Sequence, residues 1–179
     1  DYVCSKIIRQ IESLDYSICG GINNVQGIGI GVPGPVDTER GVMIMATNLP
    51  GFENYPICEK LSSRFNLPVF IDNDANVAGL AEALLGAGKG KPTCYYVTIS
   101  TGIGGAFVVN GQLVSGGRGH AGEVGNIIVK NNGYKFGGLN PGAVEGEASG
   151  TAITRKGKEI LGEDRVNHAG DVFRLADEG

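Results

Sequence analysis

The amino-acid sequence predicts an α/β fold with mixed sheets flanked by helices. Three observations support this prediction: a strand-helix-strand pattern in the first half, antiparallel strand signals in the second half, and a high glycine content. Glycine makes up 31 of 179 residues, whereas about 7% is usual. Because 41% of the residues are apolar, the glycines indicate turns that approach a ligand rather than a disordered chain.

The first half of the chain has the pattern of a strand-helix-strand unit. Apolar residues at helical spacing predict that residues 3–14 form a helix. Residues 25–32, VQGIGIGV, alternate apolar residues with glycine and run into the rigid turn 33–35, as a strand does. A second helix with one apolar face follows at 57–65, and residues 67–71 form the next strand. A helix between two strands predicts that the strands pair in parallel.

The second half opens on a helix and then changes to antiparallel strands. Residues 77–88 have a helical pattern and end in glycines. Two strand-like segments, 94–100 and 106–114, flank a glycine-rich turn. The Asn110-Gly111 pair in the second segment is a strong hairpin signal. We therefore expect this half to be richer in antiparallel strand.

The last third of the chain predicts helices, and the whole pattern suggests two domains. Helical periodicity over 144–161, interrupted by two glycines, predicts one helix with a weak point, and another helix begins near residue 170. We expect residues 1–77 to be the remainder of a smaller α/β domain and residues 78–179 to be the first part of a larger one. Neither end completes a unit, so we expect the chain to be the middle of a longer one.

Charge and hydropathy argue against several classes of protein. A net charge of −4 and a pI near 5.2 argue against a nucleic-acid surface, because phosphate binding needs clustered Lys and Arg. Apolar runs fall short of the roughly 20 residues of a membrane helix, and the N-terminus has no signal pattern. The four cysteines are scattered, with no close pair to chelate a metal. We expect a cytoplasmic protein with no nucleic-acid or membrane partner.

The most informative stretch is residues 69–80, VFIDNDANVAGL, where polar side chains follow an apolar strand. Asp72, Asn73 and Asp74 stand at the carboxyl end of that strand, where α/β sheets bind their ligands. A carboxylate there is a candidate general base toward a hydroxyl. The alternative is a helix cap, because Asp and Asn side chains satisfy the free N–H groups of a first turn. One cap needs one residue, so three polar residues in a row favour a site.

Three further stretches are candidates for ligand contacts, and each has a simpler explanation. Residues 97–107 place two hydroxyl side chains before glycines whose N–H groups can converge on an anion, but glycine-rich turns without a ligand are common. Residues 116–126 carry charged and polar side chains among five glycines, and a solvated loop explains them equally well. Glu145 stands near a helix start, where the helix dipole alone favours a carboxylate.

Taken together and in this order, these stretches resemble one family. The sequence is similar to the signature of the ROK sugar kinases (repressor, open reading frame, kinase) at Ile99, Gly102, Gly104, Ala106, Gly116, Gly122 and Gly125. The resemblance extends from GIGVPGPVD at 29–37 to EASGTAI at 147–153, over essentially the whole chain. It implies an actin-like ATPase (ribonuclease H-like) fold within a two-domain sugar kinase.

The resemblance implies a role for each matched residue on the sugar side. Asp74 matches the family's catalytic base, which takes the proton from a sugar hydroxyl as that hydroxyl attacks the γ-phosphate of ATP. Asn73 matches the neighbouring sugar-binding asparagine. The other sugar-binding positions that the resemblance implies are Gly34, Thr47, Asn48, Glu123, Asn126 and Glu145. Carboxylates and amides suit this role because sugar hydroxyls need both donors and acceptors.

On the nucleotide side, the resemblance implies that Thr101, Gly102 and Gly104 belong to a phosphate-binding turn. Amide donors and one carboxylate base are what phosphoryl transfer requires of the protein. The cofactors implied are ATP and the Mg²⁺ that accompanies its phosphates. The partner implied is a hexose substrate, and a homodimer stays open as an alternative to the monomer.

One departure from the family concerns zinc. Many ROK kinases bind a structural zinc through a histidine after the GE-x-G motif and three cysteines further on. Here the histidine position is Asn126, and the cysteine positions are Tyr134, Phe136 and Ala143, whereas Glu145 at the end of the motif is kept. We therefore predict that the protein binds no zinc. Because the family's histidine also touches the sugar, Asn126 leaves the choice of hexose or glucoside open.

The leading hypothesis for function is an ATP-dependent hexokinase of the glucokinase type, acting on the primary hydroxyl of the sugar. The family also contains sugar-responsive transcriptional regulators, and a sugar-binding module without catalysis is a third alternative. Retention of Asp74 favours the kinase, because a regulator has no use for a base. Neither the family's first phosphate loop nor its adenine-contacting segments are visible, so we expect these 179 residues alone to be inactive.

Overall fold

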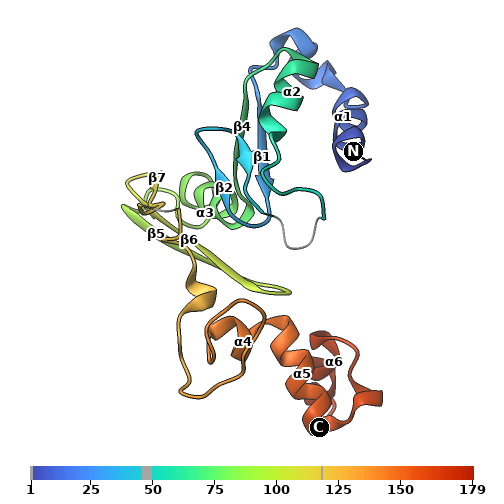
Figure 1. The fold of residues 1–179 in the computed structure, drawn as a ribbon, viewed down its shortest axis with the longest axis vertical. Helices are drawn as coiled ribbons and strands as arrows, with labels where there is room; N and C mark the ends of the chain where they lie inside the picture. Colours follow the sequence, from blue (N-terminus) through green and yellow to red (C-terminus); the bar gives the residue numbers. More distant parts are fainter. Residues whose placement is uncertain (1, 46–49, 118) are drawn as a thin grey trace. The chain divides into compact units, whose positions relative to one another are not determined.

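The structure, a computed structural model, describes residues 2–45, 50–117 and 119–179. It divides into two compact units, Asp1–Val77 and Ala78–Gly179, which Figure 1 colours along the sequence. The boundary falls inside helix α3, Asp74–Leu84. The assignment of these units to the smaller and larger domains of a kinase stays a prediction.

The first unit is built on a parallel pair of strands, as the sequence predicted. Strand β1, Ile28–Val32, pairs with β4, Val69–Asn73, and the register runs from Ile28 opposite Val69 to Val32 opposite Asn73. The chain between them contains helix α2, Ile57–Phe65. The remaining elements of this unit are α1 (Tyr2–Glu12), η1 (Tyr16–Cys19), η2 (Ile22–Asn24), β2 (Val36–Asp37) and β3 (Val42–Met43).

The core of the first unit lies between the helices and the paired strands. Ile57 and Leu61, on the apolar face of α2, are almost completely buried, together with Met43 and with Ile71 of β4. Helix α2 ends at Asn66, whose φ of 52° is the left-handed conformation that asparagine tolerates. This packing fixes the position of β4 and, with it, the position of the polar residues at its carboxyl end.

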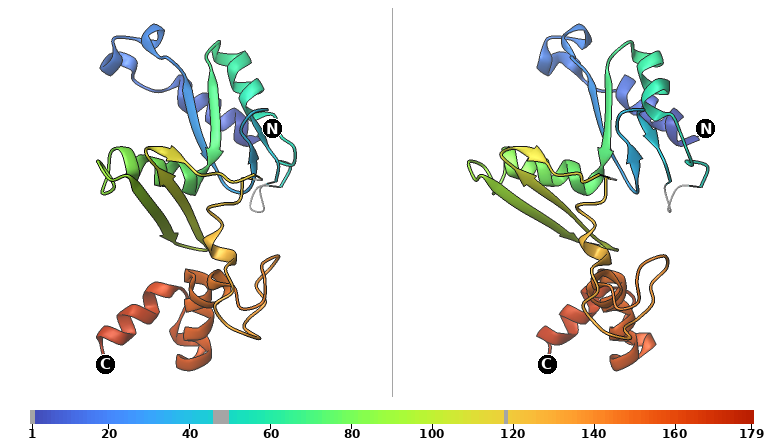
Figure 2. Two further views of the ribbon diagram at one scale, coloured as in Figure 1. Left: turned by 90° about the vertical axis from the view of Figure 1, so that its left-hand side faces the viewer. Right: turned by 60° about the vertical axis from the view of Figure 1, so that its left-hand side comes forward.

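The second unit contains an antiparallel sheet of three strands. Strand β5, Thr93–Ile99, pairs with β6, Ile103–Val109, which pairs with β7, Gln112–Leu113. The expected Asn110-Gly111 hairpin is confirmed, since both residues have a positive φ, 50° and 76°. Helix α3 lies beside this sheet (Figure 2), with Gly79 against Ala106. A Cβ at Gly79 would lie 2.5 Å from that of Ala106, so the close approach requires glycine.

The helix expected over 144–161 is in fact two helices, so this prediction was wrong in its continuity. Helix α4 spans Val144–Ala148, and α5 spans Gly150–Leu161. The break is at Ser149, which has extended backbone angles and whose Oγ accepts a hydrogen bond from Ala152 N as the cap of α5. The other elements of this unit are η3 (Val124–Asn126), η4 (Glu163–Arg165) and α6 (Ala169–Asp177).

Helices α4, α5 and α6 follow one another at the C-terminal end of the chain in Figure 1. The final helix agrees with the prediction near residue 170. Over the residues that the structure describes, no helix combines the length and the apolar character needed to span a bilayer.

Candidate functional site

The tip of β4 carries a polar cluster whose members have different partners. Asp72 Oδ1 accepts hydrogen bonds from Asn73 N at 2.7 Å and from Asn76 Nδ2 at 2.8 Å. Asn73 Oδ1 accepts from Ala75 N at 3.0 Å and from Asn76 N at 3.4 Å. Asn73 therefore caps α3, and Asp72 is committed to Asn76.

Asp74, the first residue of α3, is exposed. Its Oδ1 accepts one hydrogen bond, from the adjacent Ala75 N at 2.9 Å. Among residues 2–45, 50–117 and 119–179, no donor reaches its second oxygen, Oδ2. Since Asn73 supplies the cap, the Asp74 carboxylate is left open to a ligand, and its role as a base stays a prediction.

The turn after β1 lies beside this cluster. Gly34 has a φ of 82°, in the left-handed region, and its carbonyl accepts a hydrogen bond from Asn73 Nδ2 at 3.2 Å. The structure thus brings Gly34 and Asn73 together, two of the residues predicted to bind sugar. The other two predicted on this side, Thr47 and Asn48, lie outside the described residues.

In the second unit, the turn between β5 and β6 is held from α5. Ser100 N donates to Gly102 O, and Ser100 O accepts from Gly150 N at 2.8 Å. Thr151 Oγ1 donates to Thr101 O at 2.8 Å. In the described part of the chain, the N–H groups of Thr101 and Gly102 have no acceptor. Two consecutive unpaired N–H groups at a glycine turn are suited to an anion.

Glu145 holds the same turn from α4. Its Oε2 accepts a hydrogen bond from Ile103 N at 2.7 Å. A Cβ at Gly102 would lie 2.6 Å from that oxygen, so the contact leaves no room for a side chain at position 102. Sequence reasoning gave Glu145 a role toward the sugar, with the helix dipole as the simpler explanation. It missed this bond because the two residues are 42 positions apart, with no local pattern to connect them.

Close glycine contacts place η3 against β6. A Cβ at Gly122 would lie 2.3 Å from Gly105 O, and a Cβ at Gly125 would lie 2.3 Å from Ile103 O and 3.2 Å from Glu145 Oε2. Only glycine permits such an approach of backbone to backbone. The contacts bring the β5–β6 turn, Glu145 and η3 together in one part of the second unit.

Three more of the predicted residues lie in or near this part of the unit. Glu123, immediately before η3, is exposed. Asn126, the last residue of η3, accepts a hydrogen bond at Oδ1 from Asn140 N at 2.8 Å. Gly104 lies within β6, opposite Thr98, and is therefore in the strand and not in the turn itself.

The positions where the resemblance expects zinc ligands have other contacts. Ala143 is completely buried and forms a β-bridge with Ile128. The rings of Tyr134 and Phe136 lie with their centroids 6.5 Å apart. In the described ranges, no three His, Cys, Asp or Glu side chains are grouped so that they could hold a metal ion.

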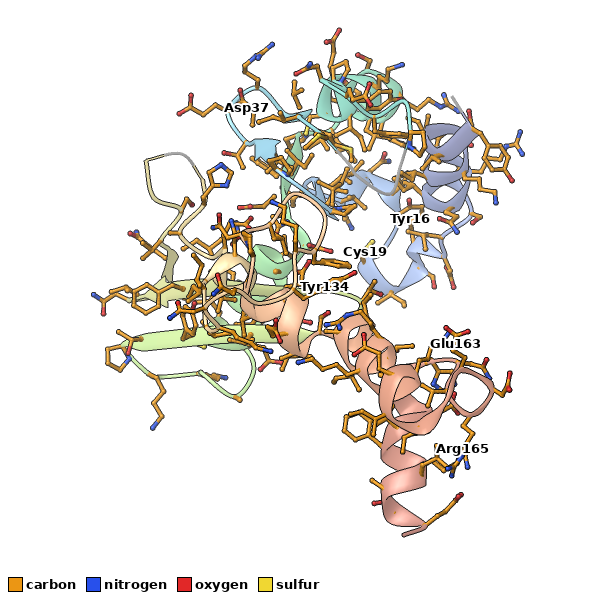
Figure 3. All side chains as sticks on the ribbon, turned by 60° about the horizontal axis from the view of Figure 1, so that its bottom comes forward. Tyr16, Cys19, Asp37, Tyr134, Glu163 and Arg165 are labelled. Atoms are coloured by element: carbon orange, nitrogen blue, oxygen red, sulfur yellow. The ribbon has the colours of Figure 1, made fainter. Side chains whose placement is uncertain are left out.

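A cavity of about 560 Å³ lies along α5. Thr151, which also donates a hydrogen bond to Thr101 O, lines this cavity from α5. Glu163, labelled in Figure 3, lines it from η4. Its lining residues are all polar or charged: Thr151, Thr154, Arg155, Lys158, Glu159 and Glu163. The cavity therefore adjoins the turn, and both cationic and anionic side chains line it.

Glu147 is a residue that sequence reasoning missed. Its pKa is lowered from 4.5 to about 2, first by the hydrogen bond from Lys156, then by the one from Tyr134 N, and further by the charge of Lys130. In the sequence, Glu147 is only an acid two positions after Glu145. Its position does not reveal that Lys156, Tyr134 and Lys130 surround its carboxylate. The carboxylate is therefore ionised throughout the ordinary pH range.

The stabilisation from Glu147 should depend on pH in a defined window. Because its folded-state pKa is depressed, its contribution is complete above the unfolded pKa near 4.5 and is lost as pH falls toward about 2. We expect the difference in unfolding free energy between wild type and Glu147→Gln to be constant from pH 6 down to about pH 5 and to shrink from there to pH 2.5. Urea unfolding of the intact protein across this range measures it, and a difference that is constant with pH would contradict the assignment.

The sequence of this chain is similar to those of known proteins. The profile of the ROK family matches residues 3–179. Glucokinase from Thermotoga maritima is 35% identical over 170 residues, which cover 95% of this chain and 52% of that protein. The xylose repressor of Bacillus subtilis is 33% identical over 155 residues, which cover 83% of this chain and 40% of that protein. The chain spans about half the length of the curated relatives it matches, or less.

Solved structures of proteins from the same family are also similar to this chain. The ROK hexokinase from Thermus thermophilus superposes with a TM-score of 0.77 and 39% identity, covering 86% of this chain and 50% of that one. A ROK family glucokinase from Streptomyces griseus, in complex with glucose and AMPPNP, superposes with a TM-score of 0.69 and 29% identity. The match covers 91% of this chain and 59% of that one. The predicted sugar-kinase fold of the actin-like ATPase type is confirmed.

Proposed function

This chain belongs to the ROK family, and we propose that it is part of an ATP-dependent kinase that phosphorylates a glucose-type hexose at its primary hydroxyl. The observation that carries the proposal is the exposure of the Asp74 carboxylate and the hydrogen bonds around it. Its carboxylate is exposed at the tip of β4, while the neighbouring Asn73 serves as the helix cap. Its second oxygen, Oδ2, receives no donor from the described residues, and Asp74 follows directly after the packed strand β4, as suits a catalytic base.

In the proposed reaction, Asp74 accepts the proton of the sugar hydroxyl as its oxygen attacks the γ-phosphorus of ATP. Asn73 positions the sugar beside it. Asn73 Oδ1 is occupied by the first turn of α3, and one Nδ2 hydrogen goes to Gly34 O. The second Nδ2 hydrogen remains for a sugar oxygen, since an amide nitrogen carries two.

We assign the other hydroxyl contacts to Glu123, Asn126 and Glu145. Glu145 uses Oε2 for Ile103 N and keeps Oε1 for a ligand. Asn126 uses Oδ1 for Asn140 N and keeps its amide hydrogens. These groups supply the mixture of acceptors and donors that a sugar requires. Asn126 is shorter than the histidine that the family has at this position. This difference supports a preference among hexoses or glucosides that differs from the preference of the relatives.

The residues at the β5–β6 turn fit the nucleotide phosphates. The unpaired N–H groups of Thr101 and Gly102 support this assignment, and Gly104 follows in the strand. ATP supplies the phosphoryl group, and Mg²⁺ bound to it would neutralise the phosphate charge. The protein's own contribution is to position the turn, which Glu145, Gly150 and Thr151 hold.

A coupled assay of ADP release by the intact protein tests the proposal. The substrates are a panel of hexoses and β-glucosides, each with ATP and Mg²⁺, with a pentose and a no-sugar reaction as controls. We expect at least one hexose to give turnover well above the control reactions. A protein that binds these sugars but releases no ADP with any of them would refute the kinase assignment.

A second candidate is a sugar-responsive transcriptional repressor, which the similarity to the Bacillus subtilis xylose repressor favours. Such a protein needs the sugar ligands but not the base. Its intact form would bind operator DNA with an affinity that changes with sugar, and it would show no ADP release. The retained Asp74, whose Oδ2 receives no donor from the described residues, supports the kinase over the repressor.

A further inference from the structure

One carboxylate in the second unit gathers three groups from two different segments. Glu147 Oε1 accepts a hydrogen bond from Tyr134 N at 2.8 Å, and Oε2 accepts one from Lys156 Nζ at 2.9 Å. Lys130 Nζ lies 3.8 Å from Oε2. The Glu147 side chain is only 9% exposed, so water screens these interactions less than it would at an open surface. Glu147 therefore ties the loop 130–142 to α5.

A second contact holds the same loop from α5. The guanidinium of Arg155 lies over the ring of Tyr134, with 3.8 Å from Cζ to the ring centroid. Arg155 also donates to Gly146 O and pairs with Glu159. Both the backbone and the ring of Tyr134 are thus fixed against α4 and α5.

The loop closes on itself at Gly142. Gly142 N donates to Tyr134 O, and Gly142 O accepts from both Val129 N and Lys130 N. Gly142 has a φ of 75°, and a Cβ there would meet Lys130 O, so the closure requires glycine. The loop is therefore a closed segment that Glu147 holds at Lys130 and Tyr134, and that Arg155 also holds at Tyr134.

The ends of this loop carry residues that we assign to the sugar. Asn140, within the loop, donates to Asn126 Oδ1. After the loop, Val144 N donates to Ile127 O, and Glu145 follows in the same turn of α4 as Glu147. A loop that moved away from α4 would release Asn126 and alter the position of Glu145.

We propose that Glu147 is a positioning residue, whose carboxylate fixes the loop 130–142 and thereby holds Asn126 and Glu145 in place for the sugar. This inference rests on the proposed function of that site. Glu147 itself contacts no substrate. Its effect depends on its charge, because both lysine partners are cationic and the neutral amide of glutamine keeps only the acceptor for Tyr134 N.

The test compares Glu147→Gln with a matched control, Glu178→Gln, in the intact protein. Glu178 is also a salt-bridged carboxylate, but its partner is Arg174 on α6 and not a residue of the loop. For Glu147→Gln we expect the Kd and KM for the sugar to rise roughly tenfold, with a much smaller change in the KM for ATP. Hydrogen exchange at residues 130–142 should become faster. The control variant should match wild type in all of these measurements.

Salt distinguishes the charged clamp from a merely structural role. Protection of the amides of residues 130–142 from exchange should fall in the wild type as NaCl is raised from about 0.05 M to about 1 M. The reason is that both lysine partners of Glu147 are partly exposed, and salt screens exposed charges. In Glu147→Gln this protection should not change with salt. If Glu147→Gln does not fold, Lys156→Gln removes one partner and should give the same changes at smaller amplitude.

The outcomes separate this inference from the proposed function. Sugar affinity is measured by calorimetry without ATP, so a protein that binds sugar but transfers no phosphate still tests the clamp. A loosened loop with unchanged sugar affinity would overturn the positioning role. Unchanged exchange in Glu147→Gln would overturn the clamp itself, and an intact protein that binds no hexose would overturn both proposals.

Discussion

Replacing Asp74 by asparagine in the intact protein is expected to lower kcat for sugar phosphorylation by about 10²–10⁴-fold. Asparagine keeps the size of the side chain and the acceptor that Asp74 Oδ1 offers to Ala75 N, so the start of α3 is preserved. It removes only the basic oxygen that would take the proton. The sugar Kd should therefore stay within about twofold, as expected when an interaction made mainly in the transition state is lost. Steady-state kinetics and calorimetry measure the two quantities.

The matched control for this substitution is Asp72→Asn, two positions earlier. Asp72 Oδ1 accepts hydrogen bonds from Asn73 N and Asn76 Nδ2, and an asparagine oxygen accepts both. We expect kcat to change by less than about fivefold, because no step of the proposed reaction uses this carboxylate. If the two variants lost activity equally, the effect would come from the charge of the cluster, and the assignment of Asp74 as the base would be wrong.

Replacing Gly122 by alanine is expected to have a large effect on stability. The new Cβ would lie 2.3 Å from Gly105 O, and the nearest atoms are all backbone atoms of the central strand β6, which cannot give way as a flexible side chain does. Overpacking of this kind costs about 1–3 kcal/mol of unfolding free energy. Since Glu123 follows directly, the sugar Kd should also rise. Thermal unfolding and sugar titration of the intact protein check both effects.

Gly117→Ala is the control for this second prediction. Gly117 lies five residues earlier, its φ is not in the left-handed region, and an added Cβ would meet no atom within 4 Å. A compatible glycine-to-alanine change stabilises by about 0.4–1 kcal/mol, so this variant should unfold at or slightly above the wild-type temperature. If Gly122→Ala were as stable as Gly117→Ala, the close backbone contact between Gly122 and Gly105 would be refuted.

Much of the fold follows from local patterns in the sequence. Alternating apolar residues and the turn at Gly34 predicted β1, and the spacing of Ile57 and Leu61 predicted α2, because both patterns depend only on which face of an element is buried. The Asn110-Gly111 hairpin was predictable because positive φ angles favour these residues. The break at Ser149 was missed because the nearby glycines looked like a weak point in one helix. Local patterns also gave no sign of the long-range bond from Gly150 N to Ser100 O.

Local patterns were enough to assign the family, the order of the elements and the list of polar residues at the strand tip and the glycine turns. The contacts that each of these residues makes became known only from the folded chain. Asn73 and not Asp74 caps α3, Glu145 holds the amide of Ile103, and Glu147 fastens Tyr134. The physical reason is that propensity and periodicity act over a few residues, whereas a carboxylate takes whichever donor the folded chain brings within about 3 Å of it.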